Sequence, residues 1–194
     1  MGKGGYLSVL LRSSKTVFSF KDISLLWRTA ETNATRVRVN YYVRRGELLP
    51  LRRGLYARDK NYNRLELAAK IFIPSYVSFE TVLGMAGIAF QFYGQITVAS
   101  YLTREVTVED QTYAFNKIKP LVLTNPAGVE NKDHCSMATK ERAFLDTIYL
   151  HKDYHFDNLR PLDWDKVFEL LPAYGNKRME KKVKMFYEHF KTGE

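Results

Sequence analysis

The sequence predicts an α+β protein built from two domains, residues 1–60 and residues 61–194. The first range shows helical patterns followed by a basic hairpin pattern, and the second mixes helices with short runs rich in Val, Ile, Thr and Tyr. Residues 1–60 contain 13 Lys and Arg against 4 Asp and Glu, whereas residues 61–194 contain 17 of each. The whole formal net charge of +9 therefore lies in the first domain, which predicts a polyanionic partner for that domain.

Capping signals divide residues 1–60 into short elements. Ser19 is followed three residues later by Asp22, which is the spacing of a capping box at a helix start. Thr32 or Asn33 can cap a further helix, and Gly46 suits the position just after its end. The expected elements are helices over 5–12, 20–27 and 34–45, an extended piece over 16–18, and strands over 48–51 and 55–58.

The third expected helix has two different faces at about 100° per residue. Val39, Tyr42 and Val43 fall on one face and are expected to pack inward. A helix that only filled a core would not place Val37 and Tyr41 on the opposite side, so that side predicts a contact surface. It holds Arg36, Val37, Asn40, Tyr41 and Arg44.

Helices followed by a basic hairpin in this order are typical of a winged helix-turn-helix, so double-stranded DNA is the polyanion that we expect. In the major groove, arginine pairs with guanine, asparagine bonds adenine, and apolar side chains contact the thymine methyl group. Other arginines neutralise backbone phosphates. We expect base contacts from Thr35, Arg36, Val37, Asn40 and Tyr41, and phosphate contacts from Arg38, Arg44, Arg45, Arg52, Arg53 and Arg58.

Two other functions compete with this interpretation. A basic winged helix can dock an acidic protein without sequence-specific DNA binding, and a nucleic-acid enzyme is a third class. An anionic membrane would instead require a basic amphipathic helix with a large apolar face. No apolar run approaches the roughly 18 residues of a membrane span. We therefore expect no membrane partner and a cytoplasmic location.

The second domain is expected to be a compact mixed α+β domain without catalytic machinery. Phosphate-binding glycine patterns and the GxSxG pattern do not occur, and His134, Cys135, His151 and His155 lack further ligands at a suitable spacing. The sequence therefore predicts a protein that is not an enzyme, with no cofactor and no metal. The expected helices span 63–72, 79–86, 140–150, 164–171 and 177–190, and the expected strands span 76–78, 96–101, 105–108, 112–118 and 121–123.

Three segments resemble one protein family. The segment VRVNYYVRRGELLPLRRGLYA over 37–57 is similar to the recognition helix and wing of AbiEi-type antitoxin regulators. SYVSFETVLGMAGI over 75–88 resembles the strand and helix that open their second domain, and MATKERAFLDTIYL over 137–150 resembles a later helix. One departure is Lys140, where the family pattern has proline at the first helical turn. The resemblance covers roughly residues 5–150.

This resemblance implies a bacterial transcriptional repressor that binds inverted repeats at the promoter of its own operon. It also implies the antitoxin half of a type IV toxin–antitoxin pair, opposed to a nucleotidyltransferase toxin. In such a pair the two proteins need not form a stable complex. Residues 61–194 would then serve antitoxicity and oligomerisation, with a homo-oligomer on DNA.

Overall fold

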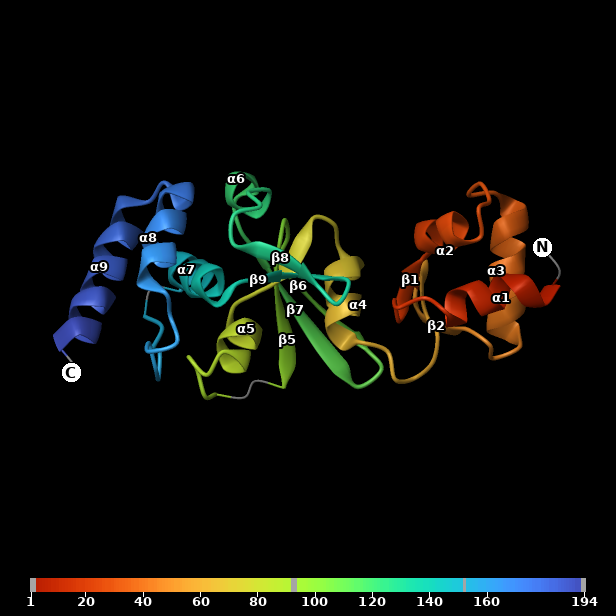
Figure 1. Cartoon of the computed structure of the whole chain (residues 1–194), viewed down its shortest axis with the longest axis horizontal. Helices are drawn as coiled ribbons and strands as arrows, with labels where there is room; N and C mark the ends of the chain where they lie inside the picture. The colour runs from red at the N-terminus through yellow and green to blue at the C-terminus, as the bar shows by residue number, and fades with distance from the viewer. Residues whose placement is uncertain (1–2, 92–93, 152, 193–194) are drawn as a thin grey trace. The chain divides into compact units, whose positions relative to one another are not determined.

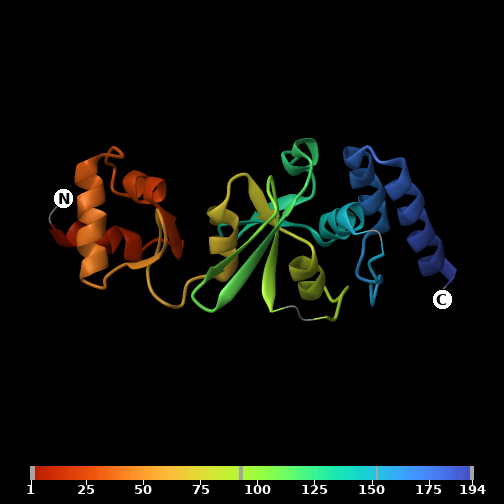
Figure 2. The same ribbon diagram turned by 180° about the vertical axis from the view of Figure 1, so that it is seen from behind.

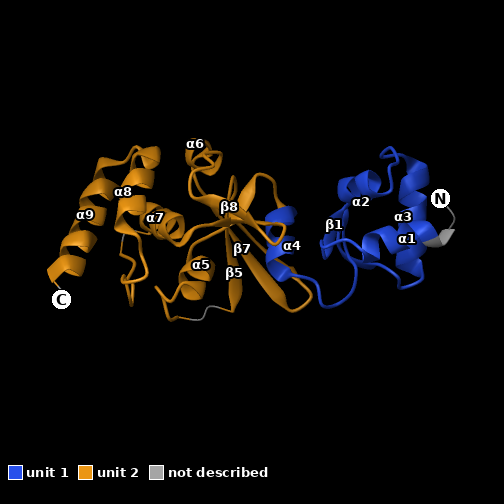
Figure 3. Ribbon diagram, viewed as in Figure 1, with its two compact units in different colours: residues 1–71 blue, residues 72–194 orange. Residues whose placement is uncertain are grey.

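The computed structural model describes residues 3–91, 94–151 and 153–192, which form a mixed α+β structure (Figure 1). The predicted α+β class is thereby confirmed. The chain divides into two compact units, unit 1 over residues 1–71 and unit 2 over residues 72–194 (Figure 3). Within the described ranges, none of the helices is both long enough and apolar enough to cross a membrane.

Unit 1 combines helices with a three-stranded antiparallel sheet of order β1-β3-β2. In the chain, a helix and a strand are followed by two helices and a hairpin, and a further helix ends the unit. The bounds are α1 Lys3–Leu11, β1 Val17–Ser19, α2 Phe20–Leu26, α3 Asn33–Arg44, β2 Leu49–Arg52, β3 Leu55–Ala57 and α4 Arg64–Ile71.

The capping signals in the sequence act as expected. The Ser19 side chain accepts a hydrogen bond from the Asp22 N–H, and the Asp22 carboxylate accepts one from the Ser19 N–H, so the capping box of α2 is confirmed. Thr32 caps α3 by accepting from the Thr35 N–H. Gly46 follows α3 with φ at 72°, a conformation that glycine adopts at little cost.

The core of unit 1 is apolar and centred on Trp27. The Trp27 ring stands edge-on to the rings of Tyr6 and Tyr42, with centroids 5.2 Å and 5.9 Å away. Its indole N–H donates to the carbonyl of Tyr6 at 2.8 Å, which satisfies the polar atom of a buried side chain. The buried members of this core are Leu10, Phe18, Ile23, Trp27, Val39, Tyr42 and Leu48.

Helix α4 belongs to unit 1, so the division falls at Ile71 rather than at the expected boundary, Lys60. The reason is Glu66, which is only 1% exposed. Its Oε2 atom accepts hydrogen bonds from the backbone N–H of Thr16 at 2.8 Å and of Val17 at 3.2 Å. These bonds fasten α4 to the start of β1.

Unit 2 is built on a six-stranded mixed sheet of order β6-β7-β5-β4-β9-β8. Strand β4 runs antiparallel to β5 and parallel to β9, and β5 runs parallel to β7. The strands are β4 Ser75–Val77, β5 Gln95–Ser100, β6 Arg104–Val108, β7 Gln111–Lys117, β8 Val129–Lys132 and β9 Cys135–Ala138.

Two helices of unit 2, α5 and α7, contact strands of this sheet. Helix α7 lies between the sheet and the pair formed by α8 and α9 (Figures 1 and 2). The helices are α5 Glu80–Met85, α6 Pro120–Leu123, α7 Lys140–Leu150, α8 Trp164–Leu170, the 3-10 helix η1 Leu171–Tyr174, and α9 Lys177–Thr192.

A buried ion pair joins these elements. Arg142 and Asp146 in α7 are both 0% exposed, with Nε and Oδ1 3.3 Å apart. The Arg142 guanidinium also donates to the carbonyl of Val122 at 2.6 Å. Asp146 accepts from the hydroxyls of Tyr76, Ser78 and Tyr174 at 3.0, 2.8 and 2.6 Å. The pair is therefore fully hydrogen-bonded and links β4, α6 and η1 to α7.

Two parts of unit 2 differ from expectation. Residues 121–123 form helix α6 and not a strand, because Pro120 occupies its first position with a fixed helical φ. The β8–β9 hairpin was not anticipated. Its turn residues Asp133 and His134 both have positive φ, at 49° and 62°, which is the geometry of a type I′ turn without the usual glycine.

Candidate nucleic-acid interface

The outer side of α3 carries five exposed side chains, which we name the α3 surface: Arg36, Val37, Asn40, Tyr41 and Arg44. The opposite side is buried, with Val39 0% and Tyr42 4% exposed. Val37 is 68% exposed and Tyr41 42% exposed. Because they stand one helical turn apart, they form an apolar strip between charged and amide groups.

Aromatic rings support two arginines of α3. The guanidinium carbon of Arg36 lies 5.3 Å from the centroid of the Phe20 ring, and that of Arg38 lies 4.1 Å from the Tyr6 ring. Stacking on a ring orients a guanidinium without removing its charge. Both positive charges therefore remain available to an anion.

The β2–β3 turn holds two more arginines, Arg52 and Arg53. Gly54 closes the turn with φ at 77°, and its carbonyl accepts from the Phe20 N–H at 3.0 Å. Phe20 therefore contacts the turn through its backbone and Arg36 through its ring. Arg53 is exposed and Arg52 is half-buried.

Tyr41 is held by its neighbours. Nη1 of Arg45 donates to the Tyr41 hydroxyl at 2.7 Å, and Nη2 lies 2.9 Å from Oε1 of Glu47. The hydrogen bond from Arg45 to Tyr41, followed by the charge of Glu47, raises the pKa of Arg45. Arg45 is thus paired with a carboxylate in this structure, while its side chain stays exposed.

Two of the expected contact residues lie elsewhere. Thr35 is 3% exposed, and its hydroxyl donates to the carbonyl of Ala30 at 2.8 Å, so its side chain is part of the core and not of the α3 surface. Arg58 is ion-paired to Asp59 at 3.1 Å. It adjoins the end of β3 that pairs with Val17, away from the Arg53–Gly54 turn.

The structure therefore exposes five of the expected residues together on the α3 surface, and it connects Arg36 to the β2–β3 turn through Phe20. Sequence reasoning missed the supporting roles of Tyr6 and Phe20, which no local pattern reveals. The spacing of Tyr41 and Arg45, four residues apart on a helix, is the one signal that could have predicted their contact.

Charge follows the same division. Unit 1 contains 15 Lys and Arg against 5 Asp and Glu, and unit 2 contains 15 against 16. The strongly basic unit is thus the one that carries the α3 surface. Long-range attraction of a polyanion is expected at unit 1.

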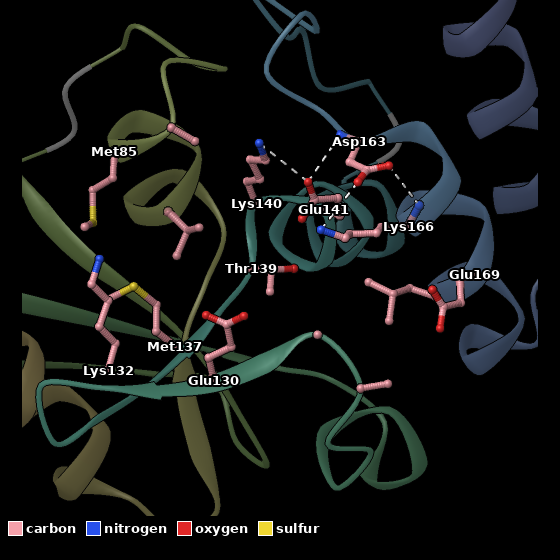
Figure 4. A pocket seen from close by; sticks show the side chains of 15 residues that line it. Met85, Glu130, Lys132, Met137, Thr139, Lys140, Glu141, Asp163, Lys166 and Glu169 are labelled. Atoms are coloured by element: carbon pink, nitrogen blue, oxygen red, sulfur yellow. Dashed lines mark hydrogen bonds and ion pairs between the residues drawn. The ribbon is translucent and has the colours of Figure 1, made fainter.

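Unit 2 has a depression of about 700 Å³ between α5, β8, α7 and α8 (Figure 4). Its wall carries both positive and negative side chains, and several of them are paired with one another. Lys140 lies 3.8 Å from Glu141, and Lys166 lies 3.4 Å from Asp163, whose N–H donates to Glu141 at 3.2 Å. Such a wall favours neither a polyanion nor a polycation.

Within residues 3–91, 94–151 and 153–192, no three His, Cys, Asp or Glu side chains are grouped to hold a metal ion. Of the His and Cys residues considered in the sequence, His134 lies in the β8–β9 turn and Cys135 is buried. Comparison of the sequence with protein-family models gives no match, and comparison with curated proteins gives no significant match.

Proposed function

We propose that this protein is a transcriptional repressor that binds double-stranded DNA through unit 1, a winged helix-turn-helix. One observation carries the proposal: the exposed side of α3 presents Arg36, Val37, Asn40, Tyr41 and Arg44 while the other side fills the core. Guanidinium, amide and apolar groups on one helix face match the three kinds of group on base edges in the major groove.

In this proposal α3 lies in the major groove and the β2–β3 turn is the wing. Phe20 contacts both the Gly54 carbonyl and the Arg36 guanidinium. Phe20 therefore connects the β2–β3 turn to the first half of α3. In this proposal both segments contact the same duplex. Arg38, Arg44, Arg52 and Arg53 then contact phosphates, which orient the protein without reading sequence.

The regulatory context comes from the three segments that resemble AbiEi-type regulators. On that basis the duplex is an inverted repeat in the promoter of the protein's own operon, bound by a homo-oligomer. The protein is then also the antitoxin of a type IV pair, acting against a nucleotidyltransferase toxin without a required stable complex. Unit 2, whose charge is nearly balanced, carries that second activity, and no enzymatic reaction or cofactor is involved.

A second candidate is a protein-interaction module that uses the same basic surface. The exposed Val37 and Tyr41 favour it, because an apolar strip ringed by charges also suits a protein partner. Under this alternative an acidic polypeptide binds unit 1 and DNA binding has no sequence preference.

Titration of the labelled promoter duplex with the full chain separates the two candidates. Four phosphate contacts predict about a 100-fold loss of affinity between about 50 and 200 mM salt. Specific recognition predicts affinity for the promoter duplex on the order of 1,000-fold above that for a random duplex of equal length. Equal affinity for the two duplexes, with tight binding of an acidic polypeptide, would favour the interaction module.

A further inference from the structure

The side chain of Tyr41 is held in place although its ring faces solvent. Its hydroxyl accepts from Arg45 Nη1 at 2.7 Å. Its ring stands edge-on to the buried Tyr42 ring, with centroids 5.4 Å apart and planes at 73°. The guanidinium carbon of Arg45 lies 5.4 Å from the same Tyr41 ring. These contacts favour one position of the ring on the α3 surface.

Arg45, which bonds Tyr41, also contacts the carboxylate of Glu47. Glu47 lies just beyond the end of α3, and its N–H donates to the carbonyl of Tyr42 at 2.9 Å. Its Oε1 atom is 2.9 Å from Nη2 of Arg45. Glu47, whose backbone is hydrogen-bonded to Tyr42, therefore contacts Arg45, and Arg45 in turn contacts the exposed Tyr41 side chain.

We propose that Tyr41 contacts the C5 methyl group of a thymine and that Arg45 and Glu47 are positioning residues for this contact. The inference rests on the proposed DNA-binding function and names the feature of the base that is read. Thymine is the only base that shows a methyl group in the major groove. Val37, one turn before Tyr41 on the same exposed side, extends the apolar surface that meets it.

This role differs from the phosphate contact that the sequence predicts for Arg45. Glu47 offsets part of the charge of the Arg45 guanidinium, whereas Arg44, the preceding residue, is exposed on the α3 surface. The two arginines therefore form a matched pair for an experiment. Replacing Arg44 should change the salt dependence of binding, and replacing Arg45 should change base discrimination.

The experiment uses the full chain and a duplex that it selects from a random-sequence library. The selected duplex is synthesised with thymine or with uracil, which lacks the methyl group. Removing one contacted methyl group should weaken wild-type binding about four-fold, the equivalent of about 0.8 kcal/mol. The ratio of the two affinities should fall toward one in Tyr41→Ala.

Two further variants test the positioning role. Arg45→Met should lower the thymine-to-uracil ratio and leave the salt slope unchanged. Arg44→Met should keep the ratio and reduce the magnitude of the salt slope by about 0.9. In a Tyr41→Phe background, which lacks the hydroxyl that Arg45 bonds, Arg45→Met should have no further effect on the ratio. Glu47→Gln should likewise lower the thymine-to-uracil ratio, and melting temperatures verify that each variant is folded.

The outcomes are distinct. Equal affinity for the thymine and uracil duplexes overturns the inference while DNA binding stands. A lower salt slope with an unchanged ratio in Arg45→Met makes Arg45 a phosphate contact and also overturns it. Failure to enrich any duplex removes the proposed function and the inference together.

Discussion

The Nζ atom of Lys70 lies 3.3 Å from Oδ2 of Asp22, so α4 is ion-paired to the first turn of α2. The same Nζ donates to the carbonyl of Val17 at 2.6 Å and lies 3.1 Å from Oε1 of Glu66. These contacts connect α4 to β1 and α2, so the helix is a structural part of unit 1. The hairpin and all the elements before it lie within residues 1–60, and α4 follows them.

A fragment of residues 1–71 is therefore expected to fold, and a fragment of residues 1–60 to be much less stable. The shorter fragment lacks Glu66, which accepts from the Thr16 and Val17 N–H groups, and lacks the Lys70 charge beside Asp22. A hydrogen bond to a charged group contributes about 1.5–3 kcal/mol, so the loss is on the order of 4 kcal/mol. Urea unfolding measures it, and equal midpoints for the two fragments would contradict the prediction.

Asp22 makes the stability of unit 1 depend on pH. Burial raises its pKa, but hydrogen bonds from Lys15 and Ser19 and the charge of Lys70 outweigh this effect and hold the pKa well below the usual carboxyl range. The unfolded value is about 3.9, so the stabilisation is complete above about pH 5 and is lost as pH falls through the lower folded-state pKa.

Asp22→Asn should therefore lower the free energy of unfolding at neutral pH by about 1.5–3 kcal/mol, the contribution of a charge-assisted hydrogen bond. The difference from wild type should shrink as the solution is acidified below about pH 4. Urea unfolding across this range measures both effects, with Glu31→Gln as the exposed control. A difference that stays constant with pH would show that the Asp22 charge is not its source.

The buried pair in α7 gives a prediction for unit 2. Asp146→Ala leaves the Arg142 guanidinium buried without its carboxylate, which typically costs about 3–5 kcal/mol. The double variant Arg142→Met with Asp146→Leu removes both charges and should recover much of that loss. Thermal unfolding of the full chain compares these variants with the exposed control Asp153→Ala. A loss for Asp146→Ala no larger than the control's would mean that the pair does not stabilise unit 2.

Local signals in the sequence predicted much of the fold. The Ser19–Asp22 capping box, Thr32 and Gly46 set the limits of α2 and α3, because capping depends on a few adjacent residues. Residues 121–123 were predicted wrongly because apolar Leu and Val suit a short strand as well as a single helical turn. The β8–β9 hairpin has no glycine signal in the sequence, because Asp133 and His134 adopt the positive φ of its turn.

The candidate site was predictable to the extent that it follows helical periodicity. The faces of α3 could be assigned from the spacing of its residues. Thr35 is an exception, because it is as polar as a surface residue, and only the structure shows that its hydroxyl donates to the carbonyl of Ala30. The role of α4 depends on contacts between residues about 50 positions apart, such as Thr16 and Glu66. No pattern within a short window encodes such contacts.

Base and phosphate contacts should respond differently to substitution. Asn40→Ala should cost about 1–3 kcal/mol on the selected duplex and little on random DNA, because a lost base contact matters only where the base is correct. Arg53→Ala, at the exposed turn, should weaken binding to both duplexes alike and reduce the magnitude of the salt slope by about 0.9. Titrations at several salt concentrations check both variants. Equal losses for Asn40→Ala on the two duplexes would remove Asn40 from base recognition.

DNA binding and antitoxicity should be separable if they belong to different units. The double variant Arg36→Ala with Asn40→Ala alters two exposed groups of the α3 surface and leaves unit 2 unchanged. If the proposed antitoxin function holds, we expect it to release repression of a promoter–reporter fusion while still protecting cells that express a cognate nucleotidyltransferase toxin. Our candidate for the protective surface is the exposed basic side of α9, which includes Lys177, Lys181 and Lys184.

Reversing those three charges with glutamate should give the opposite result, with repression kept and protection lost. Reporter output and cell survival are measured together, at matched protein levels and with folding checked by circular dichroism. The double α3 variant is decisive because the two activities share no residue in this proposal. If it loses protection while remaining folded and abundant, unit 1 serves both activities and the assignment of antitoxicity to unit 2 is wrong. The lack of any adjacent nucleotidyltransferase gene would instead contradict the antitoxin role and leave DNA binding to be judged by the titrations alone.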